Sequence, residues 1–106
     1  MSLPIEWTPL ALQSLSDIFE YTFEFFGEQQ LLKLRTQVTT AAKRIAIFPL
    51  SGKKEEYFSK IMGVEYRSTM VINEIKMIYT ILDDKLIIEY MMNTRQDEDT
   101  IAQKLK

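Results

Sequence analysis

A chain of 106 residues with 46% hydrophobic and 26% charged residues can bury one core, so we expect a single domain over residues 1–106. The sequence contains no cysteine and no histidine, which excludes disulfides, thiolate chemistry, histidine general bases and the commonest zinc ligands. The net charge of −2 argues against a dedicated, strongly basic nucleic-acid binder. No secretory leader or membrane-spanning run is visible, so we expect a cytoplasmic protein without membrane contacts.

The N-terminal part predicts a short strand followed by a long helix. Residues 3–7 read as the strand, because a proline suits the start of an edge strand. Thr8 and Pro9 are a helix start signal, with threonine as the N-cap and proline at the first helical position. The helix is expected to end at Phe26, with Gly27 as the residue that terminates it.

A second helix is expected from about residue 28 to residue 47, and Pro49 stops it. The short link between the two helices makes them antiparallel neighbours. Both carry apolar stripes, which fit burial on a sheet better than an intermolecular coiled coil.

Residues 64–95 predict an antiparallel meander of three strands. Val, Ile, Tyr and Thr are enriched, proline is absent, and two polar dipeptides are suited to tight turns. The expected strands and turns are 64–72, Asn73-Glu74, 75–82, Asp83-Asp84 and 85–92.

Alternation of side chains sorts this meander into two faces. One face is almost wholly apolar, and we expect the helical hairpin to cover it. The other face is mixed and open, with Thr69, Ile78 and Glu89 abreast and Lys76 diagonal to Glu89. This open face is where the sequence predicts the functional surface.

Residues 50–62 are polar and predict a connecting loop, and residues 96–105 predict a short C-terminal helix after a Thr94/Asp97 pair that resembles a capping box. The fold class is therefore α+β, in the order β-α-α-β-β-β-α. A small, mainly antiparallel sheet carries an N-terminal helical hairpin packed on one face.

Charge is unevenly distributed along the chain. Residues 1–27 carry a net charge of −4, residues 28–60 carry +4, and residues 61–106 carry −2. A solvated, self-complementary helix pair explains this asymmetry as well as a binding patch does.

Few catalytic arrangements are available. No nucleophile–histidine pair and no nucleotide-binding loop is present. One acidic run is read as a turn and the other as the first turn of a helix. We therefore expect no metal and no cofactor. Basic side chains remain, and these could hold an RNA backbone and stabilise the charge that develops in phosphodiester cleavage. The simpler alternative is that Lys76 pairs with Glu89, and Arg67 with Glu65 or with the acidic residues of the loop before it. The candidate target-binding residues are Lys53, Lys54, Lys60, Arg67, Lys76, Glu89 and Arg95.

Several segments along the chain resemble the RelE/ParE superfamily, the toxins of bacterial type II toxin–antitoxin systems. The resemblance covers nearly the whole chain, in order and at matching spacing. The segments are IEWTPLALQSLSDIFEY (5–21), IAIFPLSG (45–52), Tyr66-Arg67, IKMIYTI (75–81) and NTRQD (93–97).

The resemblance implies a small toxin, neutralised by an antitoxin encoded beside it whose flexible segment wraps the toxin. Proteins of the RelE-like branch are mRNA interferases, which cleave mRNA on the ribosome. Proteins of the ParE-like branch, the plasmid stabilisation type, inhibit growth by poisoning DNA gyrase. A homodimer and a toxin–antitoxin hetero-oligomer are both open, and the sequence does not decide the oligomeric state.

Carried over residue by residue, the resemblance implies Arg67, Lys76 and Arg95 as the catalytic set if the chain is RelE-like. Lys76 stands where the family usually has arginine, and no tyrosine or histidine follows Arg95. These departures and the net charge favour the ParE-like branch, with a RelE-like endoribonuclease as the alternative. A degenerate, non-toxic interaction module is a third reading.

Overall fold

The computed structural model describes all 106 residues, which form five strands and four helices. No helix combines the length and the apolar character needed to cross a bilayer. The elements in chain order are β1 (Ile5–Trp7), α1 (Pro9–Phe26), α2 (Glu28–Ile47), β2 (Lys53–Lys54), α3 (Glu56–Met62), β3 (Arg67–Ile72), β4 (Ile75–Leu82), β5 (Lys85–Asn93) and α4 (Glu98–Leu105).

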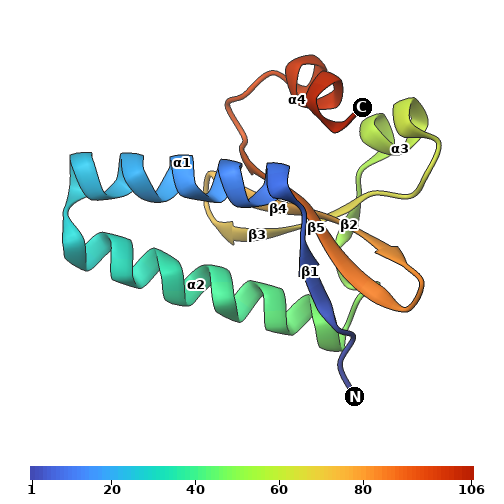
Figure 1. The fold of residues 1–106 in the computed structure, drawn as a ribbon, viewed down its shortest axis with the longest axis horizontal. Helices are drawn as coiled ribbons and strands as arrows, with labels where there is room; N and C mark the ends of the chain where they lie inside the picture. The colour runs from blue at the N-terminus through green and yellow to red at the C-terminus, as the bar shows by residue number, and fades with distance from the viewer.

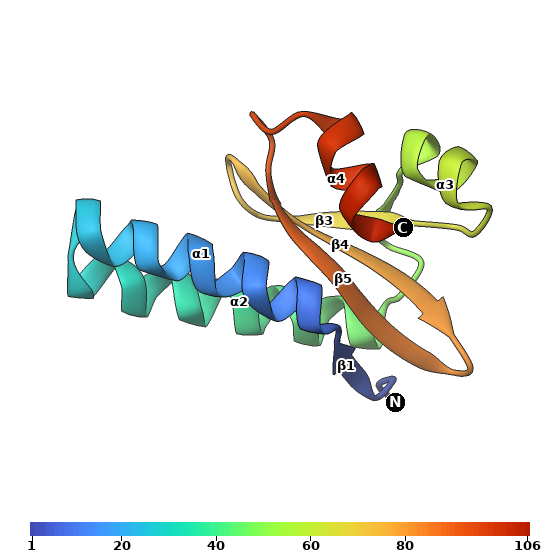
Figure 2. The same ribbon diagram turned by 45° about the horizontal axis from the view of Figure 1, so that its top comes forward.

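The strands form one sheet in the order β1-β5-β4-β3-β2. Strand β1 runs parallel to β5, and the other neighbours are antiparallel. Figure 1 shows the α1–α2 hairpin along one side of the sheet, and the turned view in Figure 2 shows α3 and α4 together on the other side. The predicted α+β class and the helical hairpin on one sheet face are therefore confirmed.

The hairpin forms where the sequence predicts it. The Thr8 hydroxyl oxygen accepts a hydrogen bond from the Ala11 amide at 3.0 Å, so Thr8 is the N-cap of α1. Gly27 has φ of +89°, a conformation that glycine adopts without a Cβ penalty, and it joins the end of α1 directly to α2.

The meander contains two irregularities that the sequence did not reveal. Tyr79 pairs with Ile88 while Ile78 pairs with Tyr90, so Glu89 is an extra residue in β5. The register also shifts between Met70 and Ile72 in β3. Each extra residue moves the following side chains to the opposite face of the sheet.

The predicted alignment of Thr69, Ile78 and Glu89 is therefore wrong. Ile78 instead lies between Ser68 and Tyr90. Thr69 faces the hairpin, where its hydroxyl accepts a hydrogen bond from Arg44 of α2 at 2.7 Å.

The two β-turns also differ from each other. Asp83 and Asp84 both have positive φ, at +52° and +58°, which is the backbone of a type I′ hairpin turn, as the sequence predicted for a tight turn. Asn73 and Glu74 keep negative φ, and the adjoining register shift in β3 accommodates that turn instead.

Side chains on the two faces of the sheet form two separate cores. The first lies under the hairpin and includes Leu34, Ile45, Met77 and Tyr79 among its buried members. The second lies on the opposite face, where α3 and α4 contribute Phe58, Ile101 and Ala102 against Tyr66, Ile78, Tyr90 and Met92. The predictions of a plain loop over residues 50–62 and of an open second face are thus wrong, because residues 53–54 form the edge strand β2, and α3 and α4 cover the second face.

One buried hydroxyl fastens α1 to the sheet. Ser14 donates to the Ala11 carbonyl at 2.8 Å and accepts from the Met91 amide of β5 at 2.9 Å. We expect Ser14→Ala to lower the free energy of unfolding by about 1–2 kcal/mol, because the Met91 amide loses its partner in a buried site. Urea unfolding measures this loss, and an exposed control on the same helix, Ser16→Ala, should change stability by less than about 0.5 kcal/mol.

Candidate functional site

Lys76 of β4 is the centre of a polar cluster on the α3–α4 side of the sheet. Its ammonium donates to Glu55 at 3.0 Å, and the Ser68 hydroxyl of β3 donates to the same carboxylate oxygen. Both charged side chains are largely removed from water, with 15% of the Lys76 side chain and 7% of the Glu55 side chain exposed. The predicted pairing of Lys76 with Glu89 is wrong, because Glu89 instead accepts a hydrogen bond from Thr80 at 2.8 Å.

The environment of Glu55 favours its ionised form. Burial raises the pKa of this carboxyl. The opposing effects are larger: hydrogen bonds from Ser68 and Lys76, and the positive charges of Lys76 and Lys53, all lower it. The pKa of Glu55 therefore lies below its ordinary value of 4.5. Lys76 is thus held as the counter-ion of a carboxylate rather than presented to a ligand.

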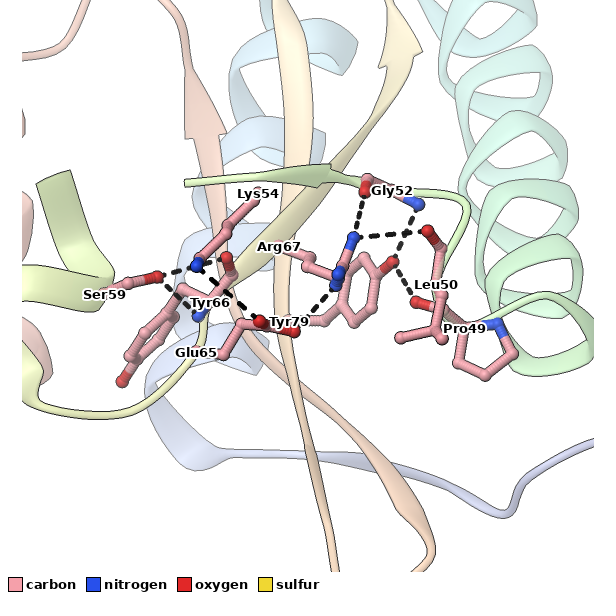
Figure 3. A network of polar contacts seen from close by, with 9 residues as sticks. All are labelled: Pro49, Leu50, Gly52, Lys54, Ser59, Glu65, Tyr66, Arg67 and Tyr79. Carbon is pink, nitrogen blue, oxygen red and sulfur yellow. Dashed lines mark hydrogen bonds and ion pairs between the residues drawn. The ribbon is translucent and has the colours of Figure 1, made fainter. Parts of the chain in front are cut away.

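Arg67 lies on the opposite face, beside Tyr79, and holds the loop that follows α2. Its guanidinium donates to the Gly52 carbonyl at 2.8 Å, to the Leu50 carbonyl at 3.2 Å and to Glu65 at 3.0 Å. Figure 3 shows these contacts converging on one side chain. The expected alternative, in which Arg67 pairs with Glu65, is therefore confirmed. All of these Arg67 contacts are with the protein's own chain, so the side chain stabilises the fold.

Tyr79 completes the same network. Its hydroxyl donates to the Pro49 carbonyl at 2.6 Å and accepts from the Gly52 amide at 3.2 Å (Figure 3). Burial raises the pKa of Tyr79, and burial, together with the negative charge of Glu89, raises the pKa of Tyr66 to about 12. Both phenols therefore remain protonated at neutral pH.

The remaining basic candidates are dispersed. Arg95, after β5, pairs with Glu74 at 2.7 Å on an exposed surface. Lys54 lies 3.9 Å from Glu65, which it shares with Arg67. Lys53 lines the same cleft as Lys76, while Lys60 is an exposed residue near the end of α3.

The structure therefore does not assemble the catalytic set of Arg67, Lys76 and Arg95 on one open face. Arg67 and Lys76 lie on opposite faces of the sheet, and each of the three side chains has its own carboxylate partner. Sequence reasoning missed Glu55, because its interaction with Lys76 depends on β2 and α3, which were predicted as a loop.

The molecule has two sizeable concavities. A polar cleft of about 610 Å³ contains Lys53, Glu55 and Lys76 on one side and the acidic start of α4, Asp97–Asp99, on the other. A second hollow of about 590 Å³, the hairpin groove, lies between α1, α2 and the ends of the central strands. Its walls include Ile18, Tyr21, Phe26, Leu34, Ile75 and Met91.

Residues 5–98 match the protein family described as the ParE toxin of the type II toxin–antitoxin system parDE. The chain belongs to the ParE toxin family. This match spans β1 through the start of α4, so it includes the hairpin, the complete sheet and every candidate residue discussed above. No curated protein sequence matches the chain.

A solved structure supports the same fold. A chain from the chromosomal ParDE toxin–antitoxin system of P. aeruginosa superposes with a TM-score of 0.70 at 17% sequence identity, covering 89% of the present chain and 98% of that chain. The ParE family lies within the RelE/ParE superfamily that the sequence resembles, so the predicted relationship is confirmed, and the chain is a toxin of the type II class.

Proposed function

We propose that this toxin acts by binding and not by cutting RNA: it inhibits growth by engaging DNA gyrase, and a cognate antitoxin silences it. This proposal rests on the positions and the ion pairs of the basic residues. The three cations that a ribonuclease would need are dispersed, and each is neutralised by a neighbouring carboxylate. A phosphodiester would have to displace these carboxylates before it could gain from the positive charges.

The hairpin groove is the surface we assign to the antitoxin. It offers apolar walls from Ile18, Tyr21 and Leu34, and its charged lining residues are Asp17, Lys104 and Glu74, the last of which pairs with Arg95. An amphipathic segment with apolar anchors fits such a groove. The segment would cover surface that is otherwise exposed to water at the end of α1.

Expression of the chain without its antitoxin tests the proposal in cells. We expect growth arrest with induction of the DNA-damage response while protein synthesis continues, because inhibited gyrase leaves DNA breaks. Co-expression of the neighbouring antitoxin gene should restore growth.

Two other outcomes identify the alternatives. Immediate arrest of translation with cuts in translated messages would contradict gyrase binding and favour the ribosome-dependent endonuclease. Unimpaired growth, combined with tight antitoxin binding, would instead indicate a degenerate interaction module.

A further inference from the structure

Strand β1 leaves one edge of the sheet open. It pairs only with β5, and Figure 2 shows it at the border of the sheet, next to the N-terminus. Before the strand, the Leu3 amide donates to the Ala46 carbonyl of α2 at 2.9 Å, and after the strand α1 begins at Pro9. The open part of this edge is therefore Ile5–Trp7, the β1 edge, and its first two residues are exposed to water.

The backbone of the β1 edge contains hydrogen-bonding groups without a partner. In a strand, the N–H and C=O groups of successive residues point to opposite sides. The Pro4 carbonyl accepts from β5 at 2.8 Å and the Thr8 amide donates to β5 at 3.1 Å, so the even-numbered residues of this stretch face β5. The N–H and C=O groups of Ile5 and Trp7 therefore point away from β5, and no other part of the molecule hydrogen-bonds to them. Two donors and two acceptors remain unpaired at this edge.

We propose that the β1 edge binds an extended segment of a partner protein, which adds a sixth strand antiparallel to β1. The main chain of the segment pairs with the outward N–H and C=O groups of Ile5 and Trp7. Main-chain pairing of this kind fixes an extended conformation for the segment, and the side chains beside the edge decide which segment fits.

Glu6 determines the charge of the segment. Its side chain is exposed and forms no ion pair in the molecule. Trp7 packs against the first core, so Ile5 and Trp7 point to the hairpin side of the sheet and Glu6 points to the other side. The residue opposite Glu6 in an antiparallel pair lies directly beside it, where lysine or arginine gives an ion pair. Its two neighbours lie beside Ile5 and Trp7, so the segment has an apolar–basic–apolar pattern.

The same carboxylate argues against a second copy as the occupant. Two β1 edges paired around a two-fold axis through their centre would place Glu6 of each copy opposite Glu6 of the other, and like charges directly opposite each other destabilise a strand pair. The β1 edge is also separate from the hairpin groove, because none of the residues from Ile5 to Trp7 lines that groove. Both surfaces can therefore be occupied at once.

The first test measures amide hydrogen exchange by NMR on the full chain with a synthetic peptide, Ser-Thr-Val-Lys-Val-Thr-Ser, blocked at both ends. We expect a dissociation constant of roughly 100 micromolar, because only three residues of the edge are open. At about ten times that peptide concentration, the Ile5 and Trp7 amides should exchange about tenfold more slowly. The Glu6 amide faces β5 and is the internal control, whose exchange should not change.

The second test removes one outward donor. Ile5→Pro deletes an N–H that points to water, a position where an edge strand tolerates proline, and it should weaken peptide binding about tenfold. Ile5→Val keeps the N–H and is the matched control, with binding within about twofold of the wild type. Circular dichroism of both variants checks that they are folded.

The third test exchanges the charge and leaves the backbone unchanged. Glu6→Lys should bind the lysine peptide about fivefold more weakly than the wild type does, because like charges then lie opposite each other. The same variant should bind a peptide with glutamate in place of lysine about fivefold more tightly than the wild type does.

The proposal is overturned if the Ile5 and Trp7 amides exchange at the same rate with and without millimolar peptide, or if Ile5→Pro binds as well as Ile5→Val. An unchanged peptide preference in Glu6→Lys would also overturn it, because the segment would then not be selected by this charge. Self-association of the free chain that Ile5→Pro abolishes would assign the edge to a second copy instead. None of these measurements involves gyrase or growth, so their failure leaves the proposed gyrase inhibition intact.

Discussion

Replacing Lys76 with methionine is expected to lower the free energy of unfolding by about 3 kcal/mol at neutral pH. The substitution keeps most of the side-chain volume but leaves the Glu55 carboxylate largely buried, with Ser68 as its remaining hydrogen-bond donor. Breaking one side of a buried ion pair costs more than the pair contributes, because the desolvated charge stays behind. Urea unfolding measures the loss.

The loss should also depend on pH in a defined direction. The pKa of Glu55 is lowered in the folded protein, so the carboxylate contributes stability above pH 4.5, and this contribution disappears as the pH falls through the lowered pKa. In Lys76→Met, burial becomes the dominant influence and raises the pKa of Glu55. The wild type should therefore lose more stability than the variant on acidification, and the difference between them should shrink towards pH 4.

The double variant Lys76→Met with Glu55→Gln is the matched control. It removes both charges, so most of the lost stability should return. A loss in Lys76→Met below about 1 kcal/mol, or one that does not change with pH, would contradict a structural role for this ion pair. The double variant should also remain toxic if the toxin acts by binding, whereas a ribonuclease that uses Lys76 would be inactivated.

Substitution of Gly52 by alanine is the second change expected to have a large effect. A Cβ atom at this position would lie 2.2 Å from the Tyr79 hydroxyl and 2.8 Å from the Ser68 carbonyl oxygen. The loop must therefore move, and the contacts of Arg67 and Tyr79 with residues 49–52 are lost with it. We expect a loss of about 3 kcal/mol in thermal or urea unfolding.

Gly63→Ala provides the comparison for that experiment. Gly63 has φ of +75° and open space around it, so alanine there meets only the cost of the left-handed backbone, about 1 kcal/mol. Equal effects at the two positions would show that the loop after α2 is not packed tightly against Tyr79.

The helical hairpin was predictable because its signals are local. Thr8-Pro9 specifies the start of α1, Gly27 its end, and Pro49 follows α2 closely, so the observed helices match the predicted ones. The Asp83-Asp84 turn was predictable for the same reason, since aspartate tolerates positive φ.

The faces of the meander were not predictable, because a bulge has no clear mark in a strand of β-branched residues. Strict alternation along β5 would place Tyr90 and Met92 on the same face as Ile88, but the extra residue Glu89 turns both towards α4. The separate register shift between Met70 and Ile72 in β3 places Arg67 opposite Tyr79, so Arg67 and Lys76 lie on opposite faces and the predicted basic surface does not form. Short elements such as β2 and α3 form through contacts with distant residues, including Phe58 with Tyr66, which a local pattern does not reveal.

The claim that this toxin acts by binding is tested most directly by titrating the purified chain into two reactions, DNA supercoiling by gyrase and translation of a defined message on ribosomes. The account predicts that supercoiling falls and cleaved DNA accumulates as toxin is added, while the message stays intact. Unchanged gyrase activity together with a message cut on the ribosome would contradict it.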